Sequence, residues 1–400
     1  MDKNLVNKVN WHHGAMQATF WGGYCAIWSF ITVLLLHLGF INTQIGIITS
    51  VSTTIPTFIA PRLSALADKD PRFSARRQAI FYTVLLEIAA LLMWGFGQYK
   101  VVDTAGYLII GTLLVIIPSY FSVMVNDFAV RGLDVNFGLG RGMGSLCYGI
   151  CSLVLGFVVE RYSPVLIVPV FAVFDALMLL SLVTFRYPLP PLPAAKAADR
   201  PISNLALLKK YPRFALMVLG CGLMMGGHGT VGTYLIHICQ RAGCDESVMG
   251  IFLCICAAVE IPVMLLFNRL LYVKPLKFWL ALSIVGFVLR QSLLAMATTP
   301  TLLYLGAFLQ IMENSLYVPA TTLYVVRYLD SANQAKGQSL LYTMANGLGP
   351  AIALFLGGRI MDIRGVNALM VMVTVFSVVG AAIVFTALFL PIGKRGGKMP

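Results

Sequence analysis

The chain has 400 residues, of which 58% are hydrophobic and only 11% are charged. A soluble domain cannot hide so large an apolar fraction from water, so this composition excludes a soluble protein and predicts a polytopic membrane protein. The apolar runs are continuous rather than alternating with period two, which favours helices over a β-barrel.

Twelve apolar runs are long enough to cross a membrane, which takes roughly 20 helical residues. In chain order they are 13–37, 44–66, 78–97, 105–126, 140–159, 164–185, 213–238, 247–268, 276–297, 301–326, 337–358 and 366–391. The widest gap, 186–212, is rich in proline and charge and predicts a linker. We therefore expect an all-α integral membrane protein with twelve transmembrane helices: a six-helix half at 1–185, a cytoplasmic linker at 186–212 and a second six-helix half at 213–400.

The formal net charge of +13 could indicate a nucleic-acid partner, but the positions of the basic residues argue against it. With the N-terminus placed in the cytoplasm, most of the 29 lysines and arginines fall in cytoplasmic segments. Those on the outer side are Lys100, Arg161, Arg241, Arg359 and Arg364. Cytoplasmic loops concentrate positive charge, so both termini are predicted to be cytoplasmic and no nucleic-acid partner is expected.

The two predicted halves resemble each other at equivalent places. The first and seventh spans contain "LLLHLG" and "TYLIHI", and the fifth and eleventh contain "GSLCYG" and "GQSLLYT". Such echoes are typical of a duplicated, pseudo-symmetric transporter whose binding site lies between the halves at mid-membrane.

Six charged residues lie inside predicted spans, where each costs about 2.5–3.5 kcal/mol and needs a partner or a wet cavity. They are Glu87, Arg141, Asp175, Glu260, Arg290 and Glu313. No motif surrounds Glu87 or Asp175, so a structural role is favoured for these two.

Arg141 and Tyr148 lie seven residues apart and so share one face of the fifth span. The segment "FGLGRGMGS" surrounds the arginine with glycines, which allow a helix or a ligand to approach closely. A guanidinium beside an aromatic ring suits a sugar or a nucleoside. The alternative is an arginine that merely pairs with a nearby acid.

On the tenth span, Gln310, Glu313 and Tyr317 follow i, i+3, i+7 spacing and are expected to share a face. Arg290, on the preceding span, is close enough in sequence order to approach Glu313. A carboxyl group that alternates between an apolar pocket and an arginine can take up a proton on one side of a membrane and release it on the other. A static ion pair would leave the same sequence pattern.

Catalytic and metal-binding patterns are missing from the sequence. His228 and His237 lie nine residues apart, which is not a metal-binding spacing, and no HExxH, GxSxG or Walker pattern is present. We therefore expect neither an enzyme nor a bound metal or cofactor.

With these residues in place, the chain resembles the major facilitator superfamily. The segment "SALADKDPRFSARR" is similar to its G-x-x-x-D-R-x-G-R-R loop motif, with Asp68 and Lys69 matching and Arg76 and Arg77 at the basic end. In that family the aspartate meets a helix N-terminus and the basic residues form a cytoplasmic gate. The segment "NFGLGRGMGSLCYGIC" is more specific, because it resembles the lactose-permease-like group of oligosaccharide:proton symporters and their nucleoside:proton symporter relatives.

The resemblance to that group implies roles for individual residues. Arg141 and Tyr148 fall on its sugar-binding arginine and on a tryptophan that stacks on the sugar. Its sugar-binding glutamate on the fourth span corresponds to Asn126 or Asp127, and Glu260 lies on a span that also carries a functional acid. Further residues match its proton-coupling arginine, histidine and glutamate without gaps; they are Arg290, Gln310 and Glu313. Glutamine replaces the histidine and cannot ionise, so the proton relay is expected to be simpler or different.

The sequence therefore predicts a proton-coupled symporter that takes up a small polar solute, a saccharide or glycoside first and a nucleoside second. The runner-up is a proton-coupled efflux antiporter, although the antiporter motif G-x-x-x-G-P-x-x-G-G is missing from the proline-free fifth span. A non-transporting membrane sensor or enzyme is the remaining alternative. The expected partners are the solute, the coupling proton and the lipid bilayer of the cell membrane, and the expected state is a monomer.

Overall fold

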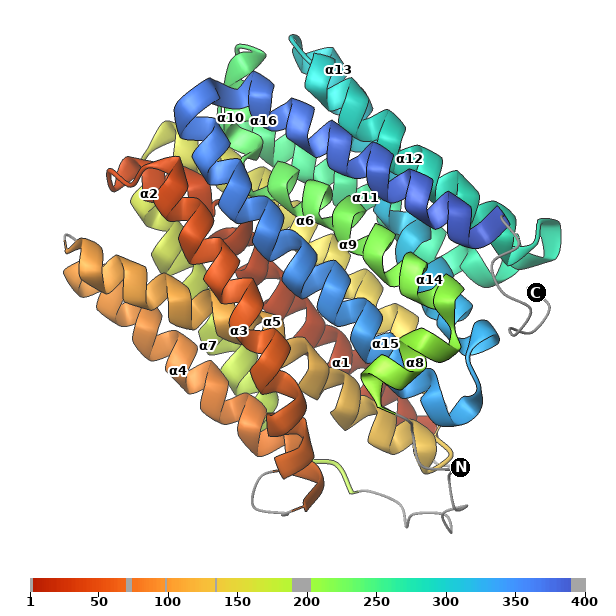
Figure 1. The fold of residues 1–400 in the computed structure, drawn as a ribbon. Coiled ribbons are helices and arrows are strands. Elements are labelled where there is room, and N and C mark those ends of the chain that lie inside the picture. The colour runs from red at the N-terminus through yellow and green to blue at the C-terminus, as the bar shows by residue number, and fades with distance from the viewer. Residues whose placement is uncertain (1–2, 70–73, 98, 134, 189–202, 390–400) are drawn as a thin grey trace. The chain divides into compact units, whose positions relative to one another are not determined.

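The computed structural model describes residues 3–69, 74–97, 99–133, 135–188 and 203–389, without the side chains of residues 3 and 61–69. Within these ranges every regular element is a helix (Figure 1). This is the outcome expected in a hydrocarbon solvent, where a helix satisfies its own backbone polar groups. The chain divides into two compact units, Met1–Lys196 with Glu246–Ala257, and Ala197–Asp245 with Ala258–Pro400.

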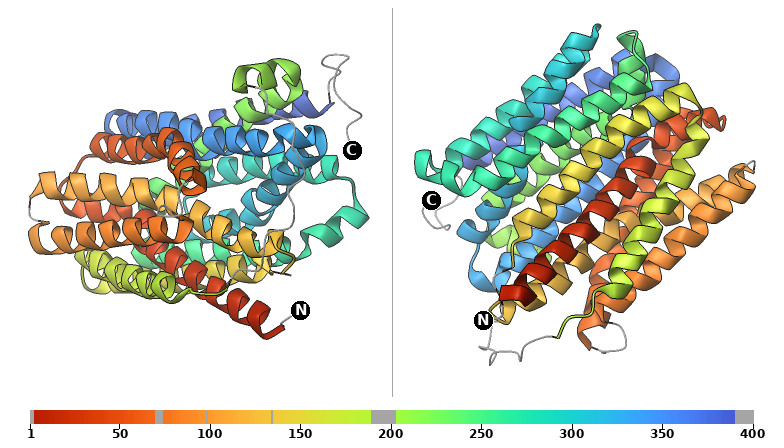
Figure 2. Two further views of the ribbon diagram at one scale, coloured as in Figure 1. Left: turned by 90° about the horizontal axis from the view of Figure 1, so that it is seen from below. Right: turned by 180° about the vertical axis from the view of Figure 1, so that it is seen from behind.

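The first unit is built from long helices joined by short connections. Its elements are α1 (Lys3–Tyr24), η1 (Cys25–Ser29), α2 (Ile31–His37), α3 (Asn42–Lys69), α4 (Ala75–Phe96), α5 (Lys100–Val130), α6 (Phe137–Arg161), η3 (Pro164–Leu166) and α7 (Ile167–Thr184). Helix α1 packs along α6 and also touches α7, while α4 packs on α5 and α7 (Figure 2). The π-helical turn η1 widens α1 just before α2, a feature that is frequent at functional sites.

The second unit holds the later helices, and α11 (Glu246–Val273) begins in the first unit and ends in the second. Its other elements are α8 (Asn204–Lys210), α9 (Pro212–Thr233), α10 (Leu235–Arg241), α12 (Leu276–Met296), α13 (Pro300–Phe308), η4 (Leu309–Ile311), α14 (Asn314–Tyr328), η5 (Ser331–Asn333), α15 (Gln334–Tyr342), η6 (Thr343–Leu348) and α16 (Gly349–Phe389). Helix α16 packs along α9 and α12, and α12 packs on α14.

Glycines allow the backbones of α9 and α16 to touch. A methyl group on Gly226 would lie 2.9 Å from the carbonyl oxygen of Gly349, and one on Gly220 would lie 2.7 Å from that of Gly380. Small residues at such contacts are the usual means of close helix packing in membranes, because lipid offers no hydrophobic drive for association. Gly349 and Gly380 lie on either side of the bend at Gly365, so both arms of α16, before and after this bend, pack against α9.

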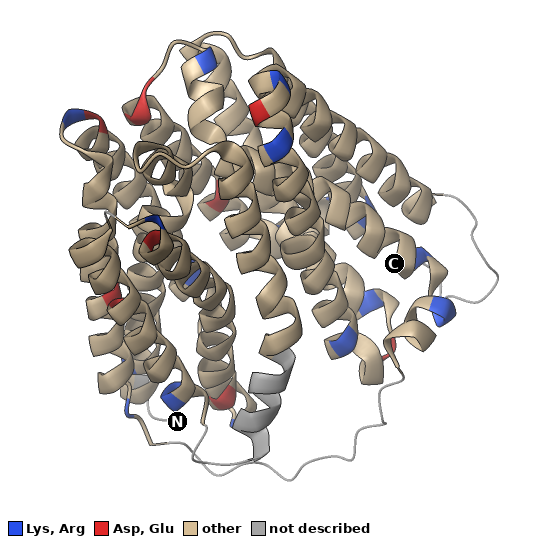
Figure 3. Cartoon of the chain, turned by 60° about the vertical axis from the view of Figure 1, so that its left-hand side comes forward, with Lys and Arg blue, Asp and Glu red and all other residues tan. Residues whose placement is uncertain are grey.

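The twelve predicted spans all fall on helices, as far as residue 389. In the described part of the chain, eight helical stretches are long and apolar enough to cross a membrane by themselves, and the bent pair Asn4–Ser29 and Ile31–His37 adds a ninth. The stretch Ser331–Phe389 contains two predicted spans, which meet at a bend at Gly365. The other two predicted spans correspond to α3 and to the broken helix α13–η4–α14. Charged residues lie mainly near the helix ends, and long mid-helix stretches carry none (Figure 3).

The predicted division into halves at 1–185 and 213–400 stays a prediction. Of the predicted linker 186–212, residues 189–202 lie outside the described part of the chain, and the remainder includes the short helix α8.

Candidate functional site

The second unit contains a break in a membrane-spanning helix at the position of Glu313. Helix α13 ends at Phe308, a 3₁₀ turn covers Leu309–Ile311, and Glu313 has non-helical dihedral angles (φ −77°, ψ −102°) before α14 begins. Gly286 on α12 lies against this break, since a methyl group there would be 2.6 Å from the carbonyl carbon of Met312. The hydroxyl of Ser283 donates to the carbonyl oxygen of Glu313 at 3.3 Å. Helix α12 therefore supports the break from one side.

The carboxylate of Glu313 is completely buried and is surrounded by polar side chains from two other helices. Its Oε2 accepts from Arg290 Nη1 at 2.5 Å and lies 3.1 Å from His228 Nδ1. Its Oε1 accepts from Gln291 Nε2 at 2.7 Å. Arg290, only 3% exposed, also donates through Nε to the carbonyl oxygen of Gly306 at 2.8 Å. The charge of Glu313 is thus matched by a fixed guanidinium, which a buried carboxylate requires.

A second buried acid, Glu260 on α11, lies near the same break but has its own partners. Its Oε1 accepts from Gln310 Nε2 at 3.0 Å and from Asn314 Nδ2 at 2.9 Å. Glu260 and Glu313 therefore accept these hydrogen bonds from different side chains.

The sequence-based expectation that Gln310, Glu313 and Tyr317 share one helical face does not describe this geometry. That spacing assumes a continuous helix, and the break between Ile311 and Asn314 separates the side chains. Gln310 bonds Glu260, Glu313 bonds Arg290, and Tyr317 packs edge-on against Phe287 with ring centroids 5.5 Å apart. All three side chains are buried, but each contacts a different partner.

Sequence reasoning missed two partners of Glu313, namely His228 and Gln291. His228 lies in "GGHGT" on α9, and the glycines that flank it pack against α16. Gln291 directly follows Arg290. The structure thus brings a histidine to Glu313 from α9, although position 310 holds a glutamine.

In the first unit, Arg141 is positioned by the start of α6. Asn136 caps this helix by accepting from the backbone N–H of Leu139 at 3.0 Å, and Asn10 accepts from the N–H of Asn136 at 2.9 Å. One turn later the guanidinium of Arg141 lies over the ring of Trp21, 4.1 Å from its centroid. This cation–π contact fixes Arg141 to α1.

Tyr148 also contacts the first membrane-spanning segment, but further along it. Its hydroxyl lies 2.8 Å from the hydroxyl of Ser29, at the end of η1. Arg141 and Tyr148 thus both lie against α1 and η1, as their shared face on α6 predicts. Asn126 is exposed on α5, and its neighbour Asp127 pairs with Arg131 at 3.4 Å.

The residues of the predicted gate motif are only partly described. Asp68 and Lys69 end α3, and their side chains lie outside the described part of the structure. Arg76 donates to the carbonyl oxygens of Leu182 and Val183 at 2.9 and 2.6 Å. A basic side chain at the last turn of α7 complements the negative end of that helix. Arg77 is exposed.

The remaining charged span residues, Glu87 and Asp175, lie on α4 and α7, which pack together. Asp175 is 2% exposed and Glu87 is half-buried. Neither contacts Arg141 or Glu313 by any bond that the structure shows.

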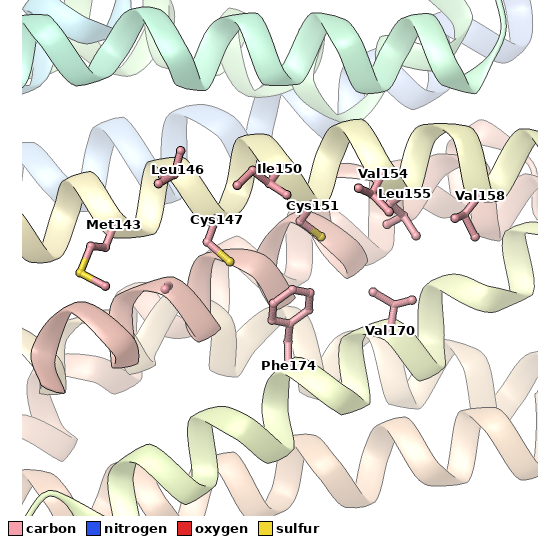
Figure 4. A pocket seen from close by; sticks show the side chains of 11 residues that line it. Met143, Leu146, Cys147, Ile150, Cys151, Val154, Leu155, Val158, Val170 and Phe174 are labelled. Carbon is pink, nitrogen blue, oxygen red and sulfur yellow. The ribbon is translucent and has the colours of Figure 1, made fainter. Parts of the chain in front are cut away.

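A cavity of about 410 Å³ opens among α1, α6 and α7 (Figure 4). Its lining is almost wholly apolar and includes Ile150, Val154 and Phe174, with the thiols of Cys147 and Cys151 (Figure 4). Arg141 and Tyr148 do not line it, so this cavity suits a hydrocarbon chain rather than a polar solute. Among the described residues, no group of three or more His, Cys, Asp or Glu side chains is arranged to hold a metal ion.

Comparisons with known proteins identify the fold to which these residues belong. The model of the MFS_1 like family matches residues 19–372. The chain is 21% identical over 383 residues to the uncharacterized transporter YwbF of Bacillus subtilis (strain 168), covering 93% of this chain and 92% of that protein. The crystal structure of the nucleoside transporter NupG is similar with a TM-score of 0.74 at 17% identity, over 97% of this chain and all of that one. The POT family transporter PepTSo gives 0.75 at 9% identity, over 95% and 97% of the two chains.

Proposed function

The chain belongs to the MFS_1 like family, whose members are membrane transporters rather than enzymes, and from this premise we propose that it imports a small polar solute together with protons. A saccharide or glycoside is the first choice of solute and a nucleoside the second. Transport proceeds by alternating access, in a cell membrane, with both termini in the cytoplasm as the distribution of basic residues indicates.

The observation that carries this proposal is the fully buried Glu313 in contact with Arg290. A buried ion pair is stable only while both charges stay together, because a lone carboxylate in this environment is strongly unfavourable. Any conformational change that draws Arg290 away therefore favours uptake of a proton by Glu313. Return of the guanidinium expels that proton, which gives one proton carried per cycle.

His228 and Gln291 complete the proposed proton site. Among the described side chains bonded to Glu313, His228 alone carries an imidazole, a group that can both accept and release a proton, so it can pass a proton to or from the carboxylate. Gln291 holds the other oxygen at 2.7 Å and orients the carboxylate toward the arginine. Gln310 is assigned to Glu260 in this scheme, and the histidine of α9 takes the relay role.

Four residues are the proposed solute contacts. Arg141 and Tyr148 supply a guanidinium and a ring for a hydroxylated solute, and Glu260 and Asn126 are further candidates for hydroxyl contacts. The likeness to a nucleoside transporter supports the nucleoside as second choice. Efflux by proton antiport remains the alternative direction; the absence of proline from α6 favours uptake, because the antiporter motif requires one there.

The test is the Glu313→Gln variant in proteoliposomes with an imposed proton gradient. Glutamine keeps the shape of the side chain but cannot carry a proton, so uphill accumulation is expected to be lost while downhill exchange continues. Glu87→Gln, an acid-to-amide change on α4, serves as the matched control and should still accumulate solute. Full accumulation by Glu313→Gln would refute the assignment.

A further inference from the structure

A stripe of three large aromatic side chains runs along the first membrane-spanning segment. Between Phe20 and Phe30 every residue is buried except Trp21, Tyr24 and Trp28, which are partly exposed. Their i, i+3, i+7 spacing places them on one face of α1 and η1. The rings of Trp21 and Tyr24 are 5.1 Å apart, and those of Tyr24 and Trp28 are stacked at 5.9 Å. The partly exposed surface of this segment is therefore aromatic.

Polar groups accompany this stripe along its whole length. Arg141 lies over Trp21, whose Nε1 donates to Gln17 Oε1 at 3.0 Å. At the other end, the hydroxyls of Ser29 and Tyr148 are bonded to each other. Arg141 lies near the start of α6, and the pair of Ser29 and Tyr148 lies further into the span; polar groups at both places are costly on a face turned toward hydrocarbon. The stripe accordingly faces a wet side of the first unit.

Glycines on the packed helices hold two of the rings in place. A methyl group on Gly144 would lie 2.5 Å from Cδ1 of Trp21, and one on Gly111 would lie 2.9 Å from Cζ3 of Trp28. Both indoles therefore rest on helix backbone, which fixes their planes before any ligand arrives. Fixed rings lower the ordering cost of binding and favour a planar ligand.

We propose that Trp21, Tyr24 and Trp28 form a stacking subsite for a planar aromatic or heteroaromatic ring of the transported solute. The inference rests on the proposed function and narrows its solute to a hydroxylated molecule that carries such a ring, an aryl glycoside or a nucleoside rather than a plain oligosaccharide. The hydroxylated part lies toward Arg141 and Tyr148, and the flat ring lies along the stripe. Offset stacking on aromatic faces stabilises such a ring beyond the burial of its area.

The test compares matched probes that differ only in the ring, by titration calorimetry on the full chain in nanodiscs. The pairs are uridine against D-ribose, and 4-nitrophenyl β-D-galactoside against methyl β-D-galactoside. In at least one pair the ring-bearing probe should bind about two- to tenfold more tightly. Tyr24→Leu and Trp28→Leu should abolish this ratio without changing the Kd of the ring-free probe, whereas Tyr24→Phe and Trp28→Phe should retain it.

Three results would overturn the inference: equal affinities within both pairs, equal weakening of both probes by the leucine variants, or no binding of either ring-bearing probe. A packing role for the stripe predicts the second of these. The result is also separable from that of the proton experiment. A ring preference with full accumulation by Glu313→Gln would refute only the proton site, and proton-driven accumulation without a ring preference would refute only this subsite.

Discussion

At the scale of single residues, the contact between Arg290 and Glu313 has an energetic consequence that can be measured. Arg290→Ala leaves a fully buried carboxylate without its counter-charge, which typically costs about 3–5 kcal/mol. The variant should therefore melt at a clearly lower temperature in detergent. The double variant Arg290→Ala/Glu313→Gln removes both charges and should recover most of that loss.

A thermal-melt series on the wild type, both single variants and the double variant gives the coupling between the two residues. Additive changes would mean that the pair is not a coupled unit in the folded protein. Ser283→Ala, which removes a hydroxyl donor to the backbone rather than a charge, is a control of smaller expected effect.

At the scale of elements, Gly286 on α12 determines how closely the break before α14 can approach. Gly286→Leu would place its Cβ 2.6 Å from the carbonyl carbon of Met312 and 2.8 Å from the backbone nitrogen of Glu313, so the break must move. Overpacking of this kind costs about 1–3 kcal/mol, and it also displaces Glu313 from Arg290. We expect lower thermal stability together with impaired accumulation.

Gly95→Leu is the matched control, because a Cβ on this helical glycine of α4 meets no atom within 4 Å. It should leave accumulation unchanged. If Gly286→Leu transports as well as the control, the close packing of α12 on the break has no role in the proton site.

The limits of sequence reasoning also lie at this scale. Long apolar runs and charged breaks predicted where the helices are, because the hydrocarbon thickness imposes their length. The break at 309–313 was not predicted: no proline lies within it, and what accompanies it is a tertiary contact, the close packing of its backbone on Gly286. The prediction that Gln310 shares a helical face with Glu313 was wrong because it assumed a continuous helix. His228 was missed because its partner is on a distant helix, and no local spacing records such a contact.

At the scale of the whole chain, the C-terminal end of the predicted linker is bonded to a distant connection. Lys210, the last residue of α8, and Tyr211, the residue after it, donate to Asp330 at 2.7 and 2.8 Å; Asp330 follows α14. Hydrogen bonds from Lys210, Tyr211 and Asn333 lower the pKa of Asp330 from 3.8 to about 2. Because the folded pKa lies below the unfolded one, the stabilisation is complete above about pH 4 and is lost as the pH falls toward 2.

Asp330→Asn should therefore lower the melting temperature by the same small amount at pH 7.5 and pH 5.5, and the difference from wild type should shrink below pH 4. Both side chains of the ion pair are substantially exposed, so added salt should reduce the difference as well. Scanning fluorimetry across these conditions checks the prediction, and a difference that grows on acidification would contradict it.

The bend at Gly365 has a mechanical implication for the second unit. This residue adopts φ 74°, ψ −175°, and it joins the two arms of α16 with helix on either side and no intervening loop. Because only one residue separates the two arms of α16, a tilt of one arm is expected to move the other arm with it, as a single bent helix. The distance between spin labels on the two arms should then stay the same throughout the transport cycle. Insertion of several residues at Gly365 should let the arms move independently while each of them stays folded.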